Sequence, residues 1–541
     1  MRNELSFRAL QRWRCMFAAL IVLVLSASLG LGAGCSKTGS AKDILVVGTT
    51  MGIKDVGITD YYMGILRSIF THNGLVTLDA EGNFVGDLAE SYETKDGKTW
   101  TFKLRKGVQW HDGRPFTASD VKFSIEYLLE KVPTYKSHWA MIDSVQAPDD
   151  HTVVITLKNP NARFLVNLIV LRTLPKHVFE RVQDPKTFTE PAAMLGTGPY
   201  VFDKFDKAAG LLVFKANQKY YRGKPNIDEV HVRLFKNPDA MYMALQKGEI
   251  DTVYFYAAGT DPIYVPRLLQ DDKVKFIFLK NLGVANAVFF NLKKPPVDDL
   301  RFRRALAYAI DYEELQRIFT AGYGTVPNAG FVPEGTPGYA ETPRMKCDKA
   351  QAIAILDEMG CKDVNGDGYR ETAKGEPLVL DLMVRGDLAE SVRLGELLQK
   401  YFAGVGVKTS LRMVDQAAFM NVADIEKSHV AFISRTTPWG MMMWGGYGTG
   451  YFDARNIGWS QVEDPAFHAL VDAALTELDP SRQKEIARKI QEYYAEHLPA
   501  IPLYWNTLIQ PYSKKFEGWY VDPINGILNK TTWFSLKKGS R

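Results

Sequence analysis

Segments with the pattern of a β-strand and segments with the pattern of an α-helix alternate along this chain, and this alternation limits its fold more than any other feature. In residues 99–131, "TWTFKL" alternates apolar and polar side chains as a half-buried strand does, and "TASDVKFSIEYLLEK" repeats apolar residues at helical spacing. Thr117 and Ser119 are candidates for the helix cap. The alternation favours an α/β fold, and 541 residues are too many for one core, so we expect two or three substructures.

The sequence "HDGRP" lies between that strand and that helix and raises the question of catalysis. A histidine beside an aspartate is how many proton-transfer sites begin. However, Asp112 followed by Gly113 is typical of a tight turn, and Pro115 keeps Arg114 extended. No serine or cysteine nucleophile stands in a motif around His111. We therefore interpret the segment as a turn.

Residues 1–34 have the three parts of a secretion signal. Four arginines precede an apolar run at 16–31, which ends in the small residues "GLGAG". The run is short for a membrane-spanning helix of about 20 residues, and an uncleaved anchor is the alternative. Cys35 resembles the lipid-accepting cysteine of a bacterial lipobox, although Gly32 replaces the usual Leu, Val or Ile. We expect a lipoprotein signal peptide at 1–34, lipidation at Cys35 and a polar tether at 35–43.

The charge of the remaining chain excludes one class of partner. Residues 1–34 carry four arginines and Glu4, so their removal leaves 62 basic and 61 acidic residues. A nearly neutral body has no basic stripe, and we expect no nucleic-acid partner. The sequence also contains no H-E-x-x-H, G-x-S-x-G, Walker or C-x-x-C motif. Together with export, these absences favour capture of a ligand over catalysis, and an exported enzyme is the remote alternative.

The body of the chain contains two cysteines, Cys347 and Cys361. Between them, "DKAQAIAILDEMG" predicts a helix. A rise of about 1.5 Å per residue holds the cysteines roughly 20 Å apart, which is too far for a disulfide bond. We expect two free and mostly buried thiols.

Five blocks of sequence occur in the order typical of one family. This chain resembles the family 5 extracellular solute-binding proteins, the peptide, dipeptide and nickel receptors of ABC importers. The blocks are "TWTFKLRKGVQWHDGRPFTASDVKFSIEYLL" at 99–129, "GTGPYVFDKFD" at 196–206, "NQKYYRGKPNIDEVHVRLF" at 217–235, "ALQKGEIDTVYF" at 244–255 and "FFNLKKPPVDDLRFRRALAYAID" at 289–311.

The resemblance implies a two-lobed periplasmic-binding-protein fold of type II, in the large variant with an extra subdomain and a hinged cleft. Lobe I would comprise residues 44–285 and 506–541, with the extra subdomain at about 85–195, and lobe II residues 286–505.

The resemblance also implies a function. The protein would be a monomer at the periplasm or the outer face of the cytoplasmic membrane, held there by its lipid. It would capture a small solute and pass it to the permease subunits of an ABC importer. A peptide is the first candidate, and nickel or another metal chelate is the alternative.

The segment 436–456 is the strongest candidate for ligand contact. It interleaves Trp439, Trp444 and Tyr447 with glycines, which let the backbone approach a ligand closely, and it ends near Asp453. Peptide-binding relatives carry a motif like W-x-x-D-Y-x-D-P here, whose aspartate can hold an ammonium group. That motif is absent, and Asp453 is the nearest acidic candidate. The alternative is an aromatic loop packed in the core.

Nickel-chelate relatives use an aromatic residue and an arginine of the extra subdomain, and Trp139 and Arg172 are the matching candidates. Arg172 lies in the apolar run "VNLIVLRTLPKHVF", where an unpaired guanidinium is costly unless it meets a carboxylate. An arginine that extends to the surface is the alternative. Three adjacent methionines, 441–443, cannot all converge on one ion, so we expect them to pack.

The sequence "DVNGDGYRE" opens like a calcium loop. Asp363, Asn365 and Asp367 have the spacing of calcium ligands, but the twelfth position is Lys374, so Glu371 would have to complete the shell. A polar turn is the alternative. No cofactor is expected to be required, and calcium, if bound, would be structural.

Overall fold

The computed structural model describes residues 42–79, 82–133, 135, 139–255, 259–443, 445–522 and 525–539. Residues 1–34, Cys35 and Trp444 therefore lie outside the described residues. Residues 43–541 form one compact unit. No helix in the described part of the chain is both long and apolar enough to span a bilayer.

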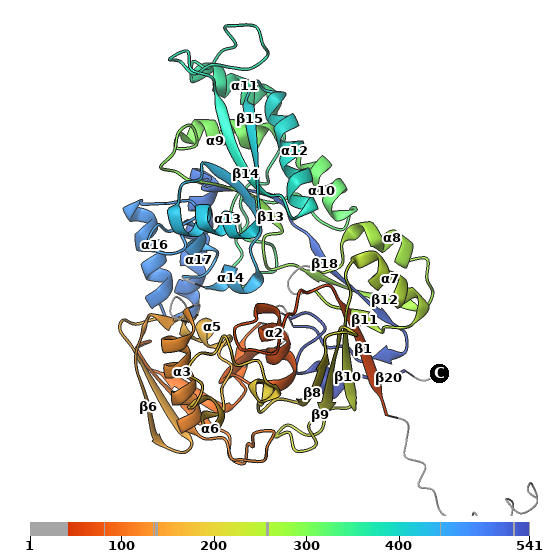
Figure 1. Cartoon of the computed structure of the whole chain (residues 1–541). Helices are drawn as coiled ribbons and strands as arrows, with labels where there is room; N and C mark the ends of the chain where they lie inside the picture. Colours follow the sequence, from red (N-terminus) through yellow and green to blue (C-terminus); the bar gives the residue numbers. More distant parts are fainter. Residues whose placement is uncertain are drawn as a thin grey trace, which may run out of the picture. The chain divides into compact units, whose positions relative to one another are not determined.

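The first sheet combines strands from the beginning and the end of the chain (Figure 1). Its seven strands have the order β12-β18-β11-β1-β10-β9-β8. β1 is apolar and largely buried, and it pairs in parallel with β10 and β11. The bounds are β1 (Ile44–Thr49), β8 (Tyr200–Asp206), β9 (Leu211–Ala216), β10 (Glu229–Leu234), β11 (Thr252–Val253), β12 (Val274–Lys280) and β18 (Thr507–Ser513).

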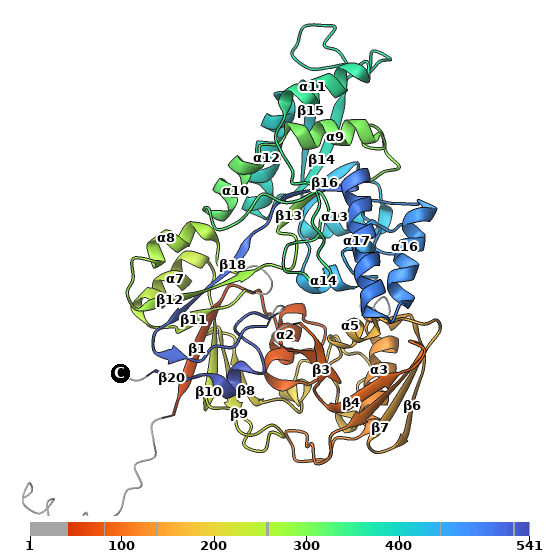
Figure 2. The same ribbon diagram turned by 180° about the vertical axis from the view of Figure 1, so that it is seen from behind.

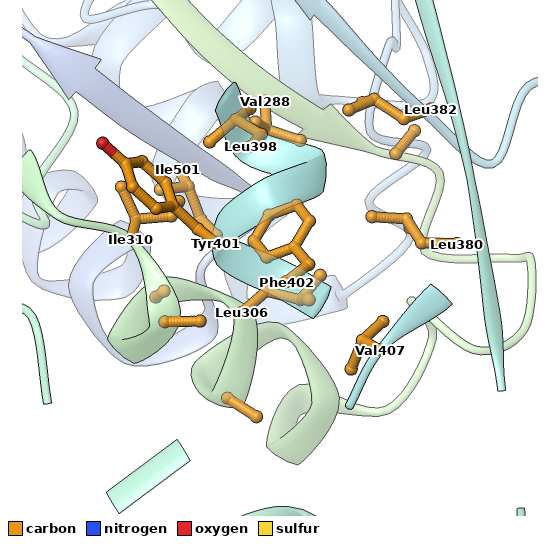
Figure 3. Close-up of a cluster of buried hydrophobic side chains, with 14 of the residues drawn as sticks. Val288, Leu306, Ile310, Leu380, Leu382, Leu398, Tyr401, Phe402, Val407 and Ile501 are labelled. Atoms are coloured by element: carbon orange, nitrogen blue, oxygen red, sulfur yellow. The ribbon is translucent and has the colours of Figure 1, made fainter. Parts of the chain in front are cut away.

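The second sheet has five strands in the order β15-β14-β16-β13-β17. Its core gathers around helix α12 (Ala389–Ala403), whose Leu398 and Phe402 lie among side chains such as Val288 and Leu380 (Figure 3). Burial of these apolar side chains fixes the helix against the sheet. The strands are β13 (Asn286–Phe290), β14 (Val379–Arg385), β15 (Lys408–Val414), β16 (Ala431–Ser434) and β17 (Ala500–Tyr504).

A third, antiparallel sheet packs with helix α3 (Ala118–Lys131). Its order is β4-β5-β7-β6, and its strands are β4 (Ala89–Thr94), β5 (Thr99–Leu104), β6 (Ile142–Asp149) and β7 (Thr152–Leu157). The predicted strand and helix are confirmed. Thr117 caps α3 in a capping box with Asp120, whereas Ser119 lies inside the helix.

The segment "HDGRP" is a turn, as predicted. Trp110 N donates to Arg114 O at 2.8 Å, and Gly113 has a φ of +86°, which favours glycine. His111 Nε2 lies 3.0 Å from the carbonyl oxygen of Gly198, and Asp112 contacts His177. These contacts join the turn to neighbouring segments, and neither of them involves a serine or cysteine side chain.

The chain crosses between the first two sheets twice, after β12 and again between β17 and β18. The two crossings are bonded to each other, because Asn281 Nδ2 donates to Asn506 Oδ1 at 2.7 Å. Gly283 in the first crossing packs so closely that an added Cβ would lie 2.6 Å from the carbonyl oxygen of Thr436. Crossings of this kind serve as hinges in two-lobed proteins.

Helices α16 and α17 lie side by side (Figures 1 and 2). The other elements are α2 (Tyr61–Leu66), η1 (Arg67–Thr71), β2 (Val76–Leu78), β3 (Phe84–Gly86), α5 (Phe164–Leu168), α6 (Lys176–Phe179), η2 (Pro191–Met194), α7 (Pro238–Lys247), η3 (Pro262–Tyr264), α8 (Val265–Leu268), α9 (Leu300–Ala309), α10 (Tyr312–Thr320), α11 (Lys349–Glu358), α13 (Gln416–Met420), η4 (Asn421–Glu426), α14 (Pro438–Met442), α15 (Thr449–Phe452), α16 (Pro465–Thr476), α17 (Pro480–His497), β19 (Phe516–Glu517), α18 (Thr532–Ser535) and β20 (Lys537–Lys538).

The two body cysteines differ in exposure. Both are free and α11 lies between them, as predicted. Cys361 is buried, but Cys347 is exposed, so the expectation of two buried thiols is wrong for Cys347. It lies in the loop that leads into α11, where the chain leaves the core. Met441 and Met443 are buried, in agreement with packing.

Candidate functional site

A small cavity lies where four distant parts of the chain meet, and we call it the α2 cavity. Its volume is about 90 Å³. Its lining comes from α2, η1 and the loop that follows, from the segment after α5, from α14, and from the C-terminal segment 522–530. The polar and aromatic side chains that matter below are His72, Asn73, Arg172, Trp439 and Lys530.

Arg172 and Trp439, two of the predicted ligand residues, line this same cavity. Arg172 Nη1 donates to the hydroxyl of Tyr135 and to the carbonyl oxygen of Val170, each at 3.2 Å. Its Nε is buried and has no hydrogen-bond partner among the described residues. Trp439 Nε1 donates to the carbonyl oxygen of Val166 at 3.2 Å, which connects α14 to α5. The arginine therefore keeps a donor for a ligand.

Buried charges lie behind the cavity wall. Asp87 has no exposed surface, and its carboxylate accepts hydrogen bonds from Lys530 Nζ at 2.7 Å, Tyr221 at 2.6 Å and Asn73 at 2.8 Å. Burial alone would raise the pKa of Asp87, but the charges of Lys530 and Arg222 outweigh it, and the pKa lies below its ordinary value. The carboxylate is therefore ionised and fully engaged.

Lys530 has a lowered pKa although it faces that carboxylate. Burial has the largest effect, and the cations Arg222 and Arg172 add to it, while Asp87 opposes it. Asp87 has two cations near it, which lower its pKa. Lys530 has one anion and two cations near it, and the two cations and burial together lower its pKa as well. The cluster joins the C-terminal segment to the loop after β3.

His72 adds a neutral polar group to the cavity. Its Nδ1 lies 2.8 Å from Thr71 Oγ1, and its Nε2 is buried without a partner in the described chain. Burial and the charge of Arg67 hold the pKa of His72 well below its usual value. The imidazole is therefore uncharged at pH 7, and Nε2 can bond to a ligand.

The structure places Trp139 behind the cavity rather than in its wall. Its ring is buried, and Nε1 donates to the carbonyl oxygen of Asn167 at 2.9 Å. The ring packs against Tyr135, with 4.7 Å between centroids, and Tyr135 in turn accepts a hydrogen bond from Arg172. Trp139 therefore positions the arginine through Tyr135.

The structure places Asp453 in the core, with 0% exposure. Arg455 Nε and Nη2 donate to its carboxylate at 3.0 and 2.8 Å, and His468 Nε2 lies 3.4 Å away. These hydrogen bonds raise the pKa of Arg455. The carboxylate thus holds the loop after α15 and offers no exposed atom to a ligand in this structure.

Tyr447 is also buried and does not line the α2 cavity. The guanidinium carbon of Arg163 lies 4.9 Å from its ring centroid, in a cation–π contact. Its φ is +55°, in the left-handed region that side chains rarely adopt. Tyr447 therefore packs the loop after α14 against the residue before α5.

A larger cavity of about 480 Å³ lies at the two chain crossings, and we call it the hinge cavity. One wall comes from α7, η3 and the loop before η3. The other wall comes from α10, α12 and the residues after β16, and both crossings contribute to the lining. A volume of this size is within the range of small-molecule sites.

The predicted calcium loop closes on its own backbone. The carboxylate of Asp363 accepts from Gly366 N and Gly368 N, at 2.7 and 2.9 Å. The side chains of Asn365, Asp367 and Glu371 likewise accept backbone amides of the loop, at 2.8, 2.8 and 2.9 Å respectively. Among the described residues, no group of three or more His, Cys, Asp or Glu side chains could hold a metal ion.

Sequence reasoning did not find Asp87, Lys530 or Arg435, the last of which lines the hinge cavity. Asp87 and Lys530 are separated by 443 residues, so no local motif links them. Arg435 left a signal, because it directly follows β16, which runs parallel to β14. In open α/β sheets, ligands bind outside the carboxyl ends of parallel strands.

Comparisons with known proteins relate this chain to one family. The pattern of the bacterial extracellular solute-binding proteins, family 5 Middle, matches residues 83–465. A putative ABC transporter peptide-binding protein of Brucella ovis is 30% identical over 351 residues, or 63% of this chain. This chain spans 62% of the length of that relative. The dipeptide-binding protein of Escherichia coli is 26% identical over 476 residues, covering 81% of this chain and 84% of that protein.

Solved structures show the same fold. NikA from Brucella suis, in complex with Fe(III)-EDTA, matches with a TM-score of 0.79 and 20% identity, over 92% of this chain and all of that chain. The oligopeptide-binding protein AppA from Bacillus subtilis, in complex with a nonapeptide, matches with a TM-score of 0.73 and 21% identity over the same shares. The predicted two-lobed α/β fold is confirmed. Since the family pattern extends over more than half of its residues, this chain belongs to the bacterial extracellular solute-binding proteins of family 5.

Proposed function

We propose that this chain is the solute-capturing component of an ABC-type importer. It takes a small solute, foremost a peptide, between its lobes and delivers it to the permease subunits. Its relatives in Brucella ovis and Escherichia coli are named as peptide-binding and dipeptide-binding proteins. The observation that carries the proposal is that Arg172 and Trp439 line one cavity although they come from different parts of the fold. Arg172 follows the last strand of the four-stranded sheet, and Trp439 follows β16 of the five-stranded sheet. A receptor that closes on its ligand needs groups from both lobes.

A metal chelate is the second candidate ligand. The buried Nε of Arg172 has no partner among the described residues, and a carboxylate of a chelating ligand would satisfy it. The NikA structure from Brucella suis contains such a ligand, Fe(III)-EDTA. In either case the protein binds its solute and does not convert it.

The location of the protein is part of the same proposal. The mature chain begins at Cys35, carries lipid there, and acts as a monomer at the periplasm or the outer face of the cytoplasmic membrane. Cells fed a labelled fatty acid should label the wild-type chain and leave Cys35→Ala unlabelled. Equal labelling of both chains would contradict the lipid anchor.

A thermal-shift screen of the mature chain tests the ligand class. The probes are peptides of two to nine residues, nickel–histidine and neutral sugars. A ligand that binds only the folded state adds about 2.7 kcal/mol of stability at a hundred times its Kd. Stabilisation by a peptide supports the first candidate, and stabilisation by nickel–histidine alone supports the second. Chemical conversion of a probe would contradict the proposal.

Variants then test the site. Arg172→Gln removes a charged donor worth about 1.5–3 kcal/mol, so the Kd of the stabilising probe should rise roughly ten- to a hundredfold. Trp439→Ala should also weaken binding, because it removes the aromatic surface of α14. Arg482→Gln is the matched control, since its side chain is 78% exposed on α17 and lines neither cavity. Unchanged binding in a folded Arg172→Gln variant would remove the arginine from the site.

A further inference from the structure

The hinge cavity gathers three arginines: Arg317 from α10, Arg393 from α12 and Arg435 from the residue after β16. In the described part of the chain, none of their side chains donates a hydrogen bond or forms an ion pair. The guanidinium carbon of Arg393 lies 5.8 Å from the ring centroid of Phe319, in a cation–π contact. The three guanidinium groups therefore keep hydrogen-bond donors for a ligand.

The two carboxylates of the cavity wall offset part of this charge but form no ion pair with the arginines. Asp261 accepts a hydrogen bond from Ile263 N at 3.0 Å, and it begins η3. Glu390 accepts from the hydroxyl of Tyr504 at 2.6 Å. Each acid accepts a hydrogen bond from a residue beside it in the cavity lining. The lining contains three cations and two anions, so its net charge is positive.

Tyr61 is the first residue of α2 and lines neither cavity itself. Its side chain is 65% exposed, and its ring packs edge-on against Tyr62, with 5.3 Å between centroids. Desolvation by the surrounding walls raises the pKa of Tyr61, whereas the charges of Arg435 and Arg172 lower it. One arginine of each cavity is therefore within electrostatic range of the Tyr61 hydroxyl.

The remaining lining limits the size and character of the occupant. Phe255, Ile263 and Phe319 supply apolar surface beside the arginines. A volume of about 480 Å³ is larger than a single inorganic anion needs and suits an organic group with several heavy atoms. An acid with an aliphatic part fits both the charge and the surface.

We propose that the hinge cavity binds an organic carboxylate group of the ligand through Arg317, Arg393 and Arg435, so that the solute is an acidic peptide or another polycarboxylate. This inference rests on the proposed function and names the ligand class of the same cleft. Arginine suits the role because its fork of donors matches a carboxylate.

Matched peptides test the inference by calorimetric titration of the mature chain. The probes are the tripeptides Ala-Ala-Glu, Ala-Ala-Gln and Ala-Ala-Lys, the same series with the variable residue first, and citrate. The better Glu peptide should bind at least about tenfold more tightly than its Gln counterpart, and the Lys peptide more weakly than both. Citrate binding would identify polycarboxylates other than peptides as a source of the same chemistry.

The double variant Arg393→Gln/Arg435→Gln should bring the Glu-to-Gln affinity ratio close to one, and Arg482→Gln should leave the ratio unchanged. Both arginines are exposed, so the variant should keep the wild-type circular dichroism spectrum. Equal affinity for the Glu and Gln peptides without citrate binding would overturn the inference alone. A ratio that persists in the double variant would also overturn it. No binding of any probe, nickel–histidine and longer peptides included, would contradict the proposed function as well.

Discussion

Replacing Lys530 by methionine should destabilise the fold by about 3–5 kcal/mol, because it leaves a buried carboxylate without its nearest cation. Asp87 has no exposed surface, and Lys530 Nζ lies 2.7 Å from its Oδ2. Arg222 remains, but its Nη1 is 3.9 Å from Oδ1, beyond hydrogen-bond distance. Methionine nearly matches the length of lysine, so the change removes charge more than packing.

Thermal melting measures this effect. An unfolding entropy of about 2.1 cal/mol/K per residue gives about 1 kcal/mol/K if residues 43–541 unfold as one unit. A loss of about 3–5 kcal/mol then lowers Tm by about 3–5 °C. Lys489→Met is the matched control, because its side chain is 53% exposed on α17, and it should change the free energy of unfolding by no more than about 0.5 kcal/mol.

The double variant Asp87→Asn/Lys530→Met separates lost pairing from lost packing. With both charges removed, no uncompensated ion remains, so the double variant should be about 1–3 kcal/mol more stable than the sum of the two single changes predicts. A Tm for Lys530→Met within 1 °C of wild type would refute the reasoning. Additive losses in the double variant would refute it too.

Three further predictions concern other parts of the chain. Burial lowers the pKa of His111 to about 4, below the value of about 6.5 in an unfolded chain. The unfolded state therefore binds the proton first, and Tm should fall as pH drops from about 6.5 to 4, less so in His111→Gln. A calcium chelator should leave Tm unchanged, because the loop oxygens of Asp363, Asn365 and Asp367 already accept backbone amides; a decrease that Asp367→Ala abolishes would show a calcium site. Cys347 should react with a thiol reagent in the folded chain and Cys361 only after denaturation, and similar rates would contradict the difference in their exposure.

Local structure was predictable wherever neighbouring residues determine it. The strand at 99–104, the turn at Asp112-Gly113 and the cap at Thr117 depend on residues within a few positions of each other. The pairing of β1 with β10 and the seven-stranded sheet that also contains β18 depend on contacts across hundreds of residues. The family resemblance predicted that residues 506–541 join residues 44–285 in one lobe, but it predicted no strand pairing.

The candidate site was predictable only in part, because the sequence shows residue types but not their distant contacts. Arg172 and Trp439 were found because an arginine in an apolar run and a tryptophan among glycines stand out in the sequence. Asp453 and Tyr447 stood out equally, yet Arg455 and Arg163 engage them. Residue type indicates what a side chain can bind, whereas its partners depend on the fold.

The residues that can bind a ligand therefore differ from the residues that hold the fold in whether their hydrogen bonds are already made, more than in burial or charge. Asp87 and Asp453 are fully buried, but each accepts several hydrogen bonds from its own chain, so a ligand would have to break those bonds to gain any. Arg172 has already lost water at its Nε without gaining a partner. A ligand carboxylate there replaces no existing bond, and its full interaction contributes to affinity. The arginines of the hinge cavity are exposed and form no ion pair within the described chain, so a ligand there has only their water to displace.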